Sequence, residues 1–202
     1  MSSTDQAPAA AVIPADAFAV LTEWLPTNDD HARPLIALAT VDAEGRPDSR
    51  SVLLSEFDEG GFFVHTDSRS RKVADVAAHP EVAFSIAWPA ELRQLTVQGI
   101  ARRASAEEES VAYERRSRYL QLLAWLNSPE FALRPAAERE EAWAAFDAAH
   151  PDGTLTPPDT WLGFVIEPTR TTFWNGTPLT ASRRTEYRRA ADGTWSTATL
   201  PG

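Results

Sequence analysis

Residues 61–78 read Gly-Phe-Phe-Val-His-Thr-Asp-Ser-Arg-Ser-Arg-Lys-Val-Ala-Asp-Val-Ala-Ala. The apolar run 61–65 predicts a β-strand, the polar residues 66–68 predict a turn, and residues 71–78 predict a helix that ends before Pro80. Hydroxyl and basic side chains gather where this helix is expected to begin. Lys72, the only lysine of the chain, is one of them. The stretch therefore predicts a strand–turn–helix unit with a cationic helix start.

Short apolar runs bounded by turn residues predict more strands on both sides of this unit. The expected strands are 35–41, 50–54, 81–88, 92–104, 161–167, 171–174, 185–189 and 194–199, and the expected helices are 15–25, 106–127 and 135–149. Strands at hairpin spacing with few helices between them indicate a closed or nearly closed antiparallel barrel, because closure removes exposed sheet edges. No strand is followed by a Gly-x-Gly-x-x-Gly motif, which disfavours a parallel dinucleotide-binding fold.

Composition narrows the class of protein. The 202 residues are 43% hydrophobic, enough for a single domain, which we expect over residues 15–202 after a disordered leader at 1–14. A net charge of −10 disfavours nucleic acid or an anionic membrane as a partner. The chain has no cysteine and only four histidines, so we expect no metal site and a cytoplasmic location.

The predicted helix start at residue 71 is a candidate phosphate site. The unpaired N–H groups and positive dipole end of a helix attract anions, and Arg50, Thr66, Ser70, Arg71 and Lys72 add hydroxyl and cationic donors. The alternative is a capped, solvated helix end with ordinary surface cations. Local basic groups on so acidic a chain fit a small anion better than a polyanion.

A wider pattern supports the phosphate interpretation. It runs through Leu38-Ala39-Thr40-Val41-Asp42, Arg50-Ser51-Val52-Leu53-Leu54, Thr66, Ser70-Arg71-Lys72, Trp88-Pro89, Arg93-Gln94, Trp161-Leu162-Gly163, Phe173-Trp174-Asn175-Gly176 and Tyr187-Arg188. From about Phe18 onward the chain thereby resembles the pyridoxamine 5′-phosphate oxidase family.

The resemblance implies a mainly β (α+β) fold, an antiparallel split β-barrel with peripheral helices, that forms a homodimer and binds FMN at the subunit interface. It also implies oxidation of a small molecule, with flavin N5 as hydride acceptor, O₂ as oxidant and no catalytic side chain. The implied flavin contacts are Arg50, Val52, Leu53, Thr66, Ser70, Arg71, Lys72, Gln94, Trp174 and Arg184.

The chain departs from the family pattern mainly where the substrate binds. Ser55 stands in the place of a lysine, Leu120 in that of a serine, and residues 180–184 replace an Arg-Leu-His-Asp-Arg motif. Near the flavin, His65 replaces an aromatic residue and Pro129-Glu130 replace Gln-Ser. Arg116 matches the family's helix arginine, and Tyr113 is one residue out of register. The candidate substrate-binding residues are Ser55, Tyr113, Arg116, Thr180, Ser182 and Arg183.

These departures favour a small organic substrate other than the vitamin phosphate for an FMN-dependent oxidase. Arg115, Arg118 or Arg183 are candidates to replace the lost contacts, because arginine binds phosphate or carboxylate bidentately. The alternative for Arg115, Arg116 and Arg118 is a solvated helix face paired with residues 107–109 or Glu114. Two other functions remain open: pyridoxamine 5′-phosphate oxidase itself, and a non-catalytic flavin-binding protein.

Overall fold

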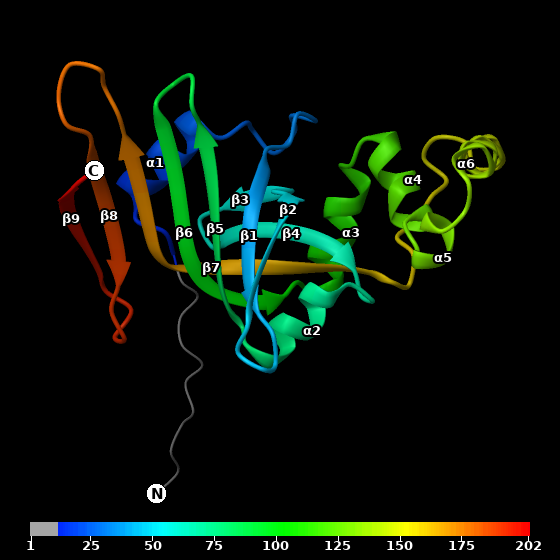
Figure 1. Cartoon of the computed structure of the whole chain (residues 1–202), viewed down its shortest axis with the longest axis horizontal. Coiled ribbons are helices and arrows are strands. Elements are labelled where there is room, and N and C mark those ends of the chain that lie inside the picture. Colours follow the sequence, from blue (N-terminus) through cyan, green and yellow to red (C-terminus); the bar gives the residue numbers. More distant parts are fainter. Residues whose placement is uncertain (1–11) are drawn as a thin grey trace, which may run out of the picture.

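The two longest strands, β6 (Arg93–Arg103) and β7 (Trp161–Asn175), lie side by side in the sheet. A computed structural model describes residues 12–202 (Figure 1). The other strands are β1 (Leu35–Val41), β2 (Pro47–Leu53), β3 (Glu56–Asp58), β4 (Gly61–Asp67), β5 (Glu81–Trp88), β8 (Arg183–Arg189) and β9 (Trp195–Pro201). The helices are α1 (Ala15–Trp24), α2 (Arg71–Ala78), α3 (Ala106–Glu114), α4 (Arg118–Leu126), α5 (Pro129–Ala132) and α6 (Ala136–Ala149).

All strand pairs are antiparallel, and the order is β2-β1-β5-β6-β7-β4-β3. The second half of β7 also pairs with β8, which in turn pairs with β9. The sheet curls into a half-barrel, and α3 to α6 lie together on one side, away from the β8–β9 hairpin (Figure 1). The expected mainly β barrel with peripheral helices is confirmed.

The strands β1, β5 and β6 alternate between buried and more exposed residues, so their apolar side chains fill one face of the half-barrel. Phe62 and Phe84 meet edge to face inside it, with ring centroids 5.0 Å apart. Helix α1 covers this core with Ala17 and Leu21, neither of which is exposed. No helix of the described residues is long and apolar enough to cross a membrane.

A bulge bends the β6–β7 ladder. Gln98 pairs with Arg170 while the next residue, Gly99, pairs with Pro168, so one residue of β7 is left without a partner. A Cβ at position 99 would lie 2.3 Å from the Glu167 carbonyl oxygen, so only glycine allows this approach. Pro168, which has no N–H to donate, is accommodated at the irregularity.

Several expected boundaries are wrong. Strands 161–167 and 171–174 are a single strand, because the bulge accommodates Pro168 within it. The expected helix 106–127 is two helices separated at residues 115–117, and α5 and β3 were not expected. Most of the predicted leader, residues 1–11, lies outside the described residues. Ile13, however, is buried and donates its N–H to the Glu59 carbonyl at 2.8 Å, so the folded domain begins before residue 15.

Candidate functional site

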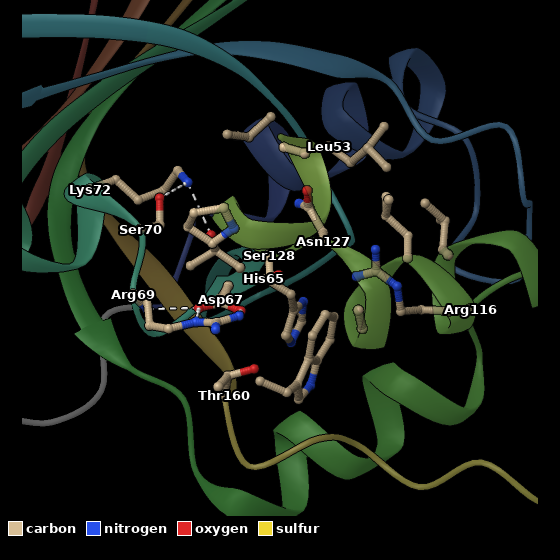
Figure 2. Close-up of a pocket in the computed structure, with 18 of the residues that line it drawn as sticks. Leu53, His65, Asp67, Arg69, Ser70, Lys72, Arg116, Asn127, Ser128 and Thr160 are labelled. Carbon is tan, nitrogen blue, oxygen red and sulfur yellow. Dashed lines mark hydrogen bonds and ion pairs between the residues drawn. The ribbon is translucent and has the colours of Figure 1, made fainter. Parts of the chain in front are cut away.

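A cavity of about 470 Å³ opens between β2, the end of β4, the start of α2 and the α4–α5 segment (Figure 2). Figure 2 shows Lys72 and Ser70 on one side of it and Arg116 on the other, with Leu53 above and His65 below. Val52 and Leu53, two of the predicted flavin contacts, line its wall. The cavity thus has a cationic group at each of two ends and apolar groups between them.

Lys72 forms the first end. Its Nζ donates to Thr66 Oγ1 at 3.0 Å and to Ser70 Oγ at 2.5 Å, and all three residues line the cavity. Burial, and then the charge of Arg50, lower the pKa of Lys72, while Asp67 and Asp75 oppose the shift. Ser70 precedes the first turn of α2, and its hydroxyl does not cap the helix backbone. An ammonium, two hydroxyls and free helix N–H groups together make an anion site.

Arg50 and Arg71, two of the predicted flavin contacts, do not line this cavity. Arg50 Nη1 donates to Thr40 Oγ1 at 2.7 Å, and Arg50 Nη2 lies 2.8 Å from Asp48 and 3.3 Å from Asp75. The Arg71 side chain is 87% exposed and pairs with Asp48 at 3.2 Å. Both guanidinium groups therefore pair with neighbouring carboxylates. The charge of Arg50 also influences the site, because burial and this charge together lower the pKa of Lys72.

Arg116 and His65 lie at the other end of the cavity. The His65 ring stacks on Trp161 at 5.0 Å with an interplanar angle of 4°, and Arg116 Cζ lies 4.5 Å from the Trp161 ring centre. Burial lowers the pKa of Arg116 to about 10, although Tyr113 opposes this. Both His65 ring nitrogens and Arg116 Nε are buried and have no hydrogen-bond partner among residues 12–202.

Several cavity residues were not expected. Arg69 lines it and forms a bidentate pair with Asp67, at 2.9 and 2.7 Å. The remaining unexpected residues come from α4, α5 and the segment before β7: Leu123, Ala124, Asn127, Ser128, Pro129, Ala132, Thr160 and Trp161. They are distant in sequence from the strand–turn–helix unit. The sequence pattern pointed to these segments only through Leu120, Pro129-Glu130 and Trp161.

Gln94, Trp174 and Arg184, the other three predicted flavin contacts, lie elsewhere. They are adjacent in register across β6, β7 and β8 and line a separate polar hollow of about 520 Å³. This hollow and the Lys72 cavity have no lining residue in common. Within one described chain the ten predicted flavin contacts therefore fall into separate groups.

The predicted substrate residues are dispersed. Ser55 lines a small cavity that shares Arg116 with the main one. Tyr113 is fully buried and donates its hydroxyl to the Gln121 carbonyl at 3.2 Å, so it is a packing residue. Thr180, Ser182 and Arg183 lie at or before the start of β8, on the side of the molecule away from α4 (Figure 1).

Arg115 and Arg118 pair with carboxylates other than residues 107–109 and Glu114, the partners that the alternative interpretation named. Arg118 Nη2 lies 2.6 Å from Asp147 of α6 and also donates to the His150 carbonyl. Arg115 Nη1 lies 3.3 Å from Glu56 of β3. Arg118 therefore ties α4 to α6, whereas Arg115 lies beside Ser55 and Arg116.

Comparisons with known proteins give a consistent result. Residues 30–175 match the family model described as pyridoxamine 5′-phosphate oxidase. A pyridoxine/pyridoxamine 5′-phosphate oxidase of Streptomyces avermitilis is 35% identical over 161 residues, 79% of this chain and 72% of the relative. One of Mesorhizobium japonicum is 34% identical over 192 residues, 92% of each chain.

Two solved structures share the fold over nearly the whole chain. PhzG from Burkholderia lata, in complex with tetrahydrophenazine-1-carboxylic acid, has a TM-score of 0.79 at 23% identity and full coverage of both chains. A pyridoxamine 5′-phosphate oxidase-related, FMN-binding protein from Nostoc punctiforme has a TM-score of 0.71 at 20% identity, over 94% of this chain and 98% of that one.

We predict that His65 lowers the stability of the protein as the pH falls. Burial and the Arg116 charge lower the pKa of His65 to about 3, against the opposing effect of Glu108. An unfolded histidine titrates near pH 6.5. Between these values the unfolded chain binds more protons, so the free energy of unfolding falls as the pH drops below about 6.5. Urea unfolding should show a loss of about 2 kcal/mol between pH 7 and 5 from this residue.

The His65→Phe variant is the control, because it keeps a flat ring against Trp161 and has no titrating group. The free energy of unfolding of this variant should not show the loss of about 2 kcal/mol between pH 7 and 5 that we assign to His65. Equal pH dependence in the variant and the parent chain, or an imidazole NMR resonance that titrates near pH 6.5, would contradict the buried neutral state.

Proposed function

The chain belongs to the pyridoxamine 5′-phosphate oxidase family, and we propose that it is an FMN-dependent oxidoreductase whose cofactor phosphate binds Thr66, Ser70 and Lys72. One observation supports this most strongly. Lys72 is half-buried at the start of α2, its hydrogen-bond partners are two hydroxyl oxygens, and all three side chains line the cavity. A lysine held by hydroxyls rather than by a carboxylate keeps its charge available to a phosphate.

The residues present fit the cofactor. The cavity volume of about 470 Å³ lies in the ordinary range for small-ligand sites. Asp67 and Asp48, carboxylates that would repel a phosphate, are paired with Arg69 and with Arg50 and Arg71. Val52, Leu53 and Leu123 provide apolar wall that excludes water from a ring system. Bound FMN would supply hydride acceptance at N5, with O₂ as the oxidant.

We further propose that the functional unit is a homodimer with composite sites. Gln94, Trp174 and Arg184 form their own polar hollow and do not reach the Lys72 cavity. A second copy of the chain that presents this hollow to the cavity would bring the two groups together. Each site would then take its phosphate contacts from one chain and Gln94, Trp174 and Arg184 from the other.

The substrate proposal is a small organic molecule that differs from the vitamin phosphate. Ser55 offers no cation where the family has a lysine, and Leu120 offers no hydroxyl where the family has a serine. Residues 180–184 lack the family's Arg-Leu-His-Asp-Arg motif. Three lost contacts at about 1.5–3 kcal/mol each would weaken phosphate binding by roughly 4.5–9 kcal/mol. The second candidate function is pyridoxine/pyridoxamine 5′-phosphate oxidase itself, the name that relatives at 34–35% identity carry.

Lys72→Ala should reduce FMN affinity about 10- to 100-fold, because it removes a charge-assisted hydrogen bond worth about 1.5–3 kcal/mol. Arg71→Ala removes an exposed cation that is adjacent in sequence to Ser70 and Lys72 but does not line the cavity, so it should change the FMN affinity less than threefold. Quenching of flavin fluorescence on titration into the flavin-free protein measures both. Equal losses in the two variants would contradict the assignment of the phosphate to Lys72.

Mixing two defective variants tests the composite site. Lys72→Ala and Arg184→Ala homodimers should each bind FMN poorly. After co-refolding, a mixed dimer should contain one site with both defects and one intact site. FMN bound per purified mixed dimer should therefore rise to about one with the parent affinity. No recovery in a verified mixed dimer would contradict the shared site.

An anaerobic bleaching assay separates the candidate functions. Pyridoxine 5′-phosphate, pyridoxamine 5′-phosphate, NADH and NADPH are added separately to the FMN-loaded protein, and the visible flavin absorbance is followed. We expect neither vitamin phosphate to bleach the flavin at millimolar concentration, because its phosphate contacts are missing. Rapid bleaching by either one would establish the second candidate function instead. Bleaching by the nicotinamides would identify a reductase.

A further inference from the structure

Asp75, on α2, is the only buried carboxylate among residues 12–202. Its Oδ2 atom accepts a hydrogen bond from Thr40 Oγ1 at 2.6 Å and another from Arg50 Nη2 at 3.3 Å. Arg50 Nη1 also donates to Thr40 Oγ1 at 2.7 Å, so the three side chains form a closed set of contacts that we call the Asp75 network. A buried carboxylate is costly even when it is paired, which indicates a role beyond packing.

The Asp75 network joins the two elements that carry the two halves of the proposed cofactor site. Thr40 and Arg50 lie on the paired strands β1 and β2, and Arg50 is two residues before Val52 of the apolar wall. Asp75 lies three residues after Lys72, one turn of α2 beyond the anion site. The network is therefore a short cross-link between the apolar wall and the anion site.

Burial distinguishes this cross-link from the second ion pair between the same two elements. Arg71 of α2 lies 3.2 Å from Asp48 of β2, and the Arg71 side chain is 87% exposed. Exposed ion pairs contribute little to stability, because water screens them. The Asp75 side chain is only 10% exposed, and hydrogen bonds are stronger at such a site than in water. The Asp75 network thus holds α2 against β1 and β2 more firmly than the exposed pair does.

We propose that Asp75 is a positioning residue for the cofactor phosphate. Through Thr40 and Arg50 it holds the first turn of α2 at a fixed separation from the apolar wall on β2. This role rests on the proposed flavin function. FMN carries its phosphate and its ring system on one molecule, so both make full contact only when the two halves of the site are correctly spaced. A looser α2 leaves each half able to bind its own group and reduces the gain from joining them.

The test compares FMN, riboflavin, which lacks the phosphate, and inorganic phosphate. Quenching of flavin fluorescence gives the affinity of the flavin-free protein for the two flavins, and competition with FMN gives its affinity for inorganic phosphate. Thr40→Val removes the hydroxyl that contacts both Asp75 and Arg50 and leaves the charge unchanged. It should weaken FMN binding about tenfold, while the affinities for riboflavin and inorganic phosphate change by no more than about twofold.

Two control variants guard against a general packing defect. Thr40→Ser keeps the hydroxyl, so its FMN affinity should stay within about twofold of that of the parent chain. Thr171→Val is the matched control for loss of a buried threonine hydroxyl. Thr171 is as buried as Thr40, at 1% exposure, and its Oγ1 atom has no hydrogen-bond partner among the described residues. This variant should bind FMN as the parent chain does.

Asp75→Asn separates position from charge. The substitution keeps the size of the side chain and removes a negative charge one helical turn from Lys72. Inorganic phosphate should therefore bind more tightly than it binds the parent chain. FMN should bind less tightly, because the pair with Arg50 that spaces the two halves is lost. A charge effect alone would tighten the binding of both ligands.

The proposal is wrong if Thr40→Val leaves the FMN affinity unchanged or weakens riboflavin binding as much as FMN binding. It is also wrong if Asp75→Asn tightens FMN binding in proportion to that of inorganic phosphate. A parent chain that binds no FMN would refute the flavin function and this role with it. A parent chain that binds FMN with an affinity independent of the Thr40 hydroxyl would refute the positioning role alone.

Discussion

The β6–β7 ladder is the constraint on which the rest of the structure depends. The first half of β7 pairs with β4, which carries Thr66 near its end and leads through a turn to Lys72. The second half pairs with β8 and aligns Trp174 with Arg184, while β6 aligns Gln94 with the same tryptophan. The bulge at Gly99 and Pro168 separates the two halves. One continuous strand therefore fixes the anion site and the polar hollow at different places on the same chain.

The cations in and around the cavity differ in whether a carboxylate neutralises them. Arg50 and Arg71 are paired with Asp48, and Arg69 with Asp67, so these guanidinium groups are satisfied before any ligand arrives. Lys72 at one end and Arg116 at the other have no carboxylate among their described contacts. Paired surface ions contribute little attraction, whereas half-buried unpaired ones contribute much more. The two ends of the cavity are thereby distinguished from the many other arginines of the chain.

Most strands and helices could be predicted from turn residues and apolar runs along the sequence. The features that could not be predicted depend on contacts between residues far apart in the chain. The helix 71–78 and the strand 35–41 were placed correctly because polar or turn residues flank each of them on both sides. Residues 115–117 carry no glycine or proline, so no strong helix-breaking residue marked the end of α3. Thr66, Ser70 and Lys72 were brought together as expected. Arg50 and Arg71 lie outside the lining of the cavity. Both pair with Asp48, and Arg50 also pairs with Asp75, which is distant from it in sequence. Trp161 and Asn127 reach the cavity from distant segments, which no pattern along the chain reveals.

The buried polar atoms around Trp161 that have no hydrogen-bond partner link ligand binding to the stability of the fold. His65 and Arg116 bury nitrogen atoms with no partner in the described chain, and each such group costs about 1–3 kcal/mol of stability. A molecule that satisfies them binds the native state and not the unfolded one, and at a hundred times its dissociation constant it adds about 2.7 kcal/mol to stability. The melting temperature of this protein is therefore itself a detector of its ligands, readable across a library of compounds before any reaction is known.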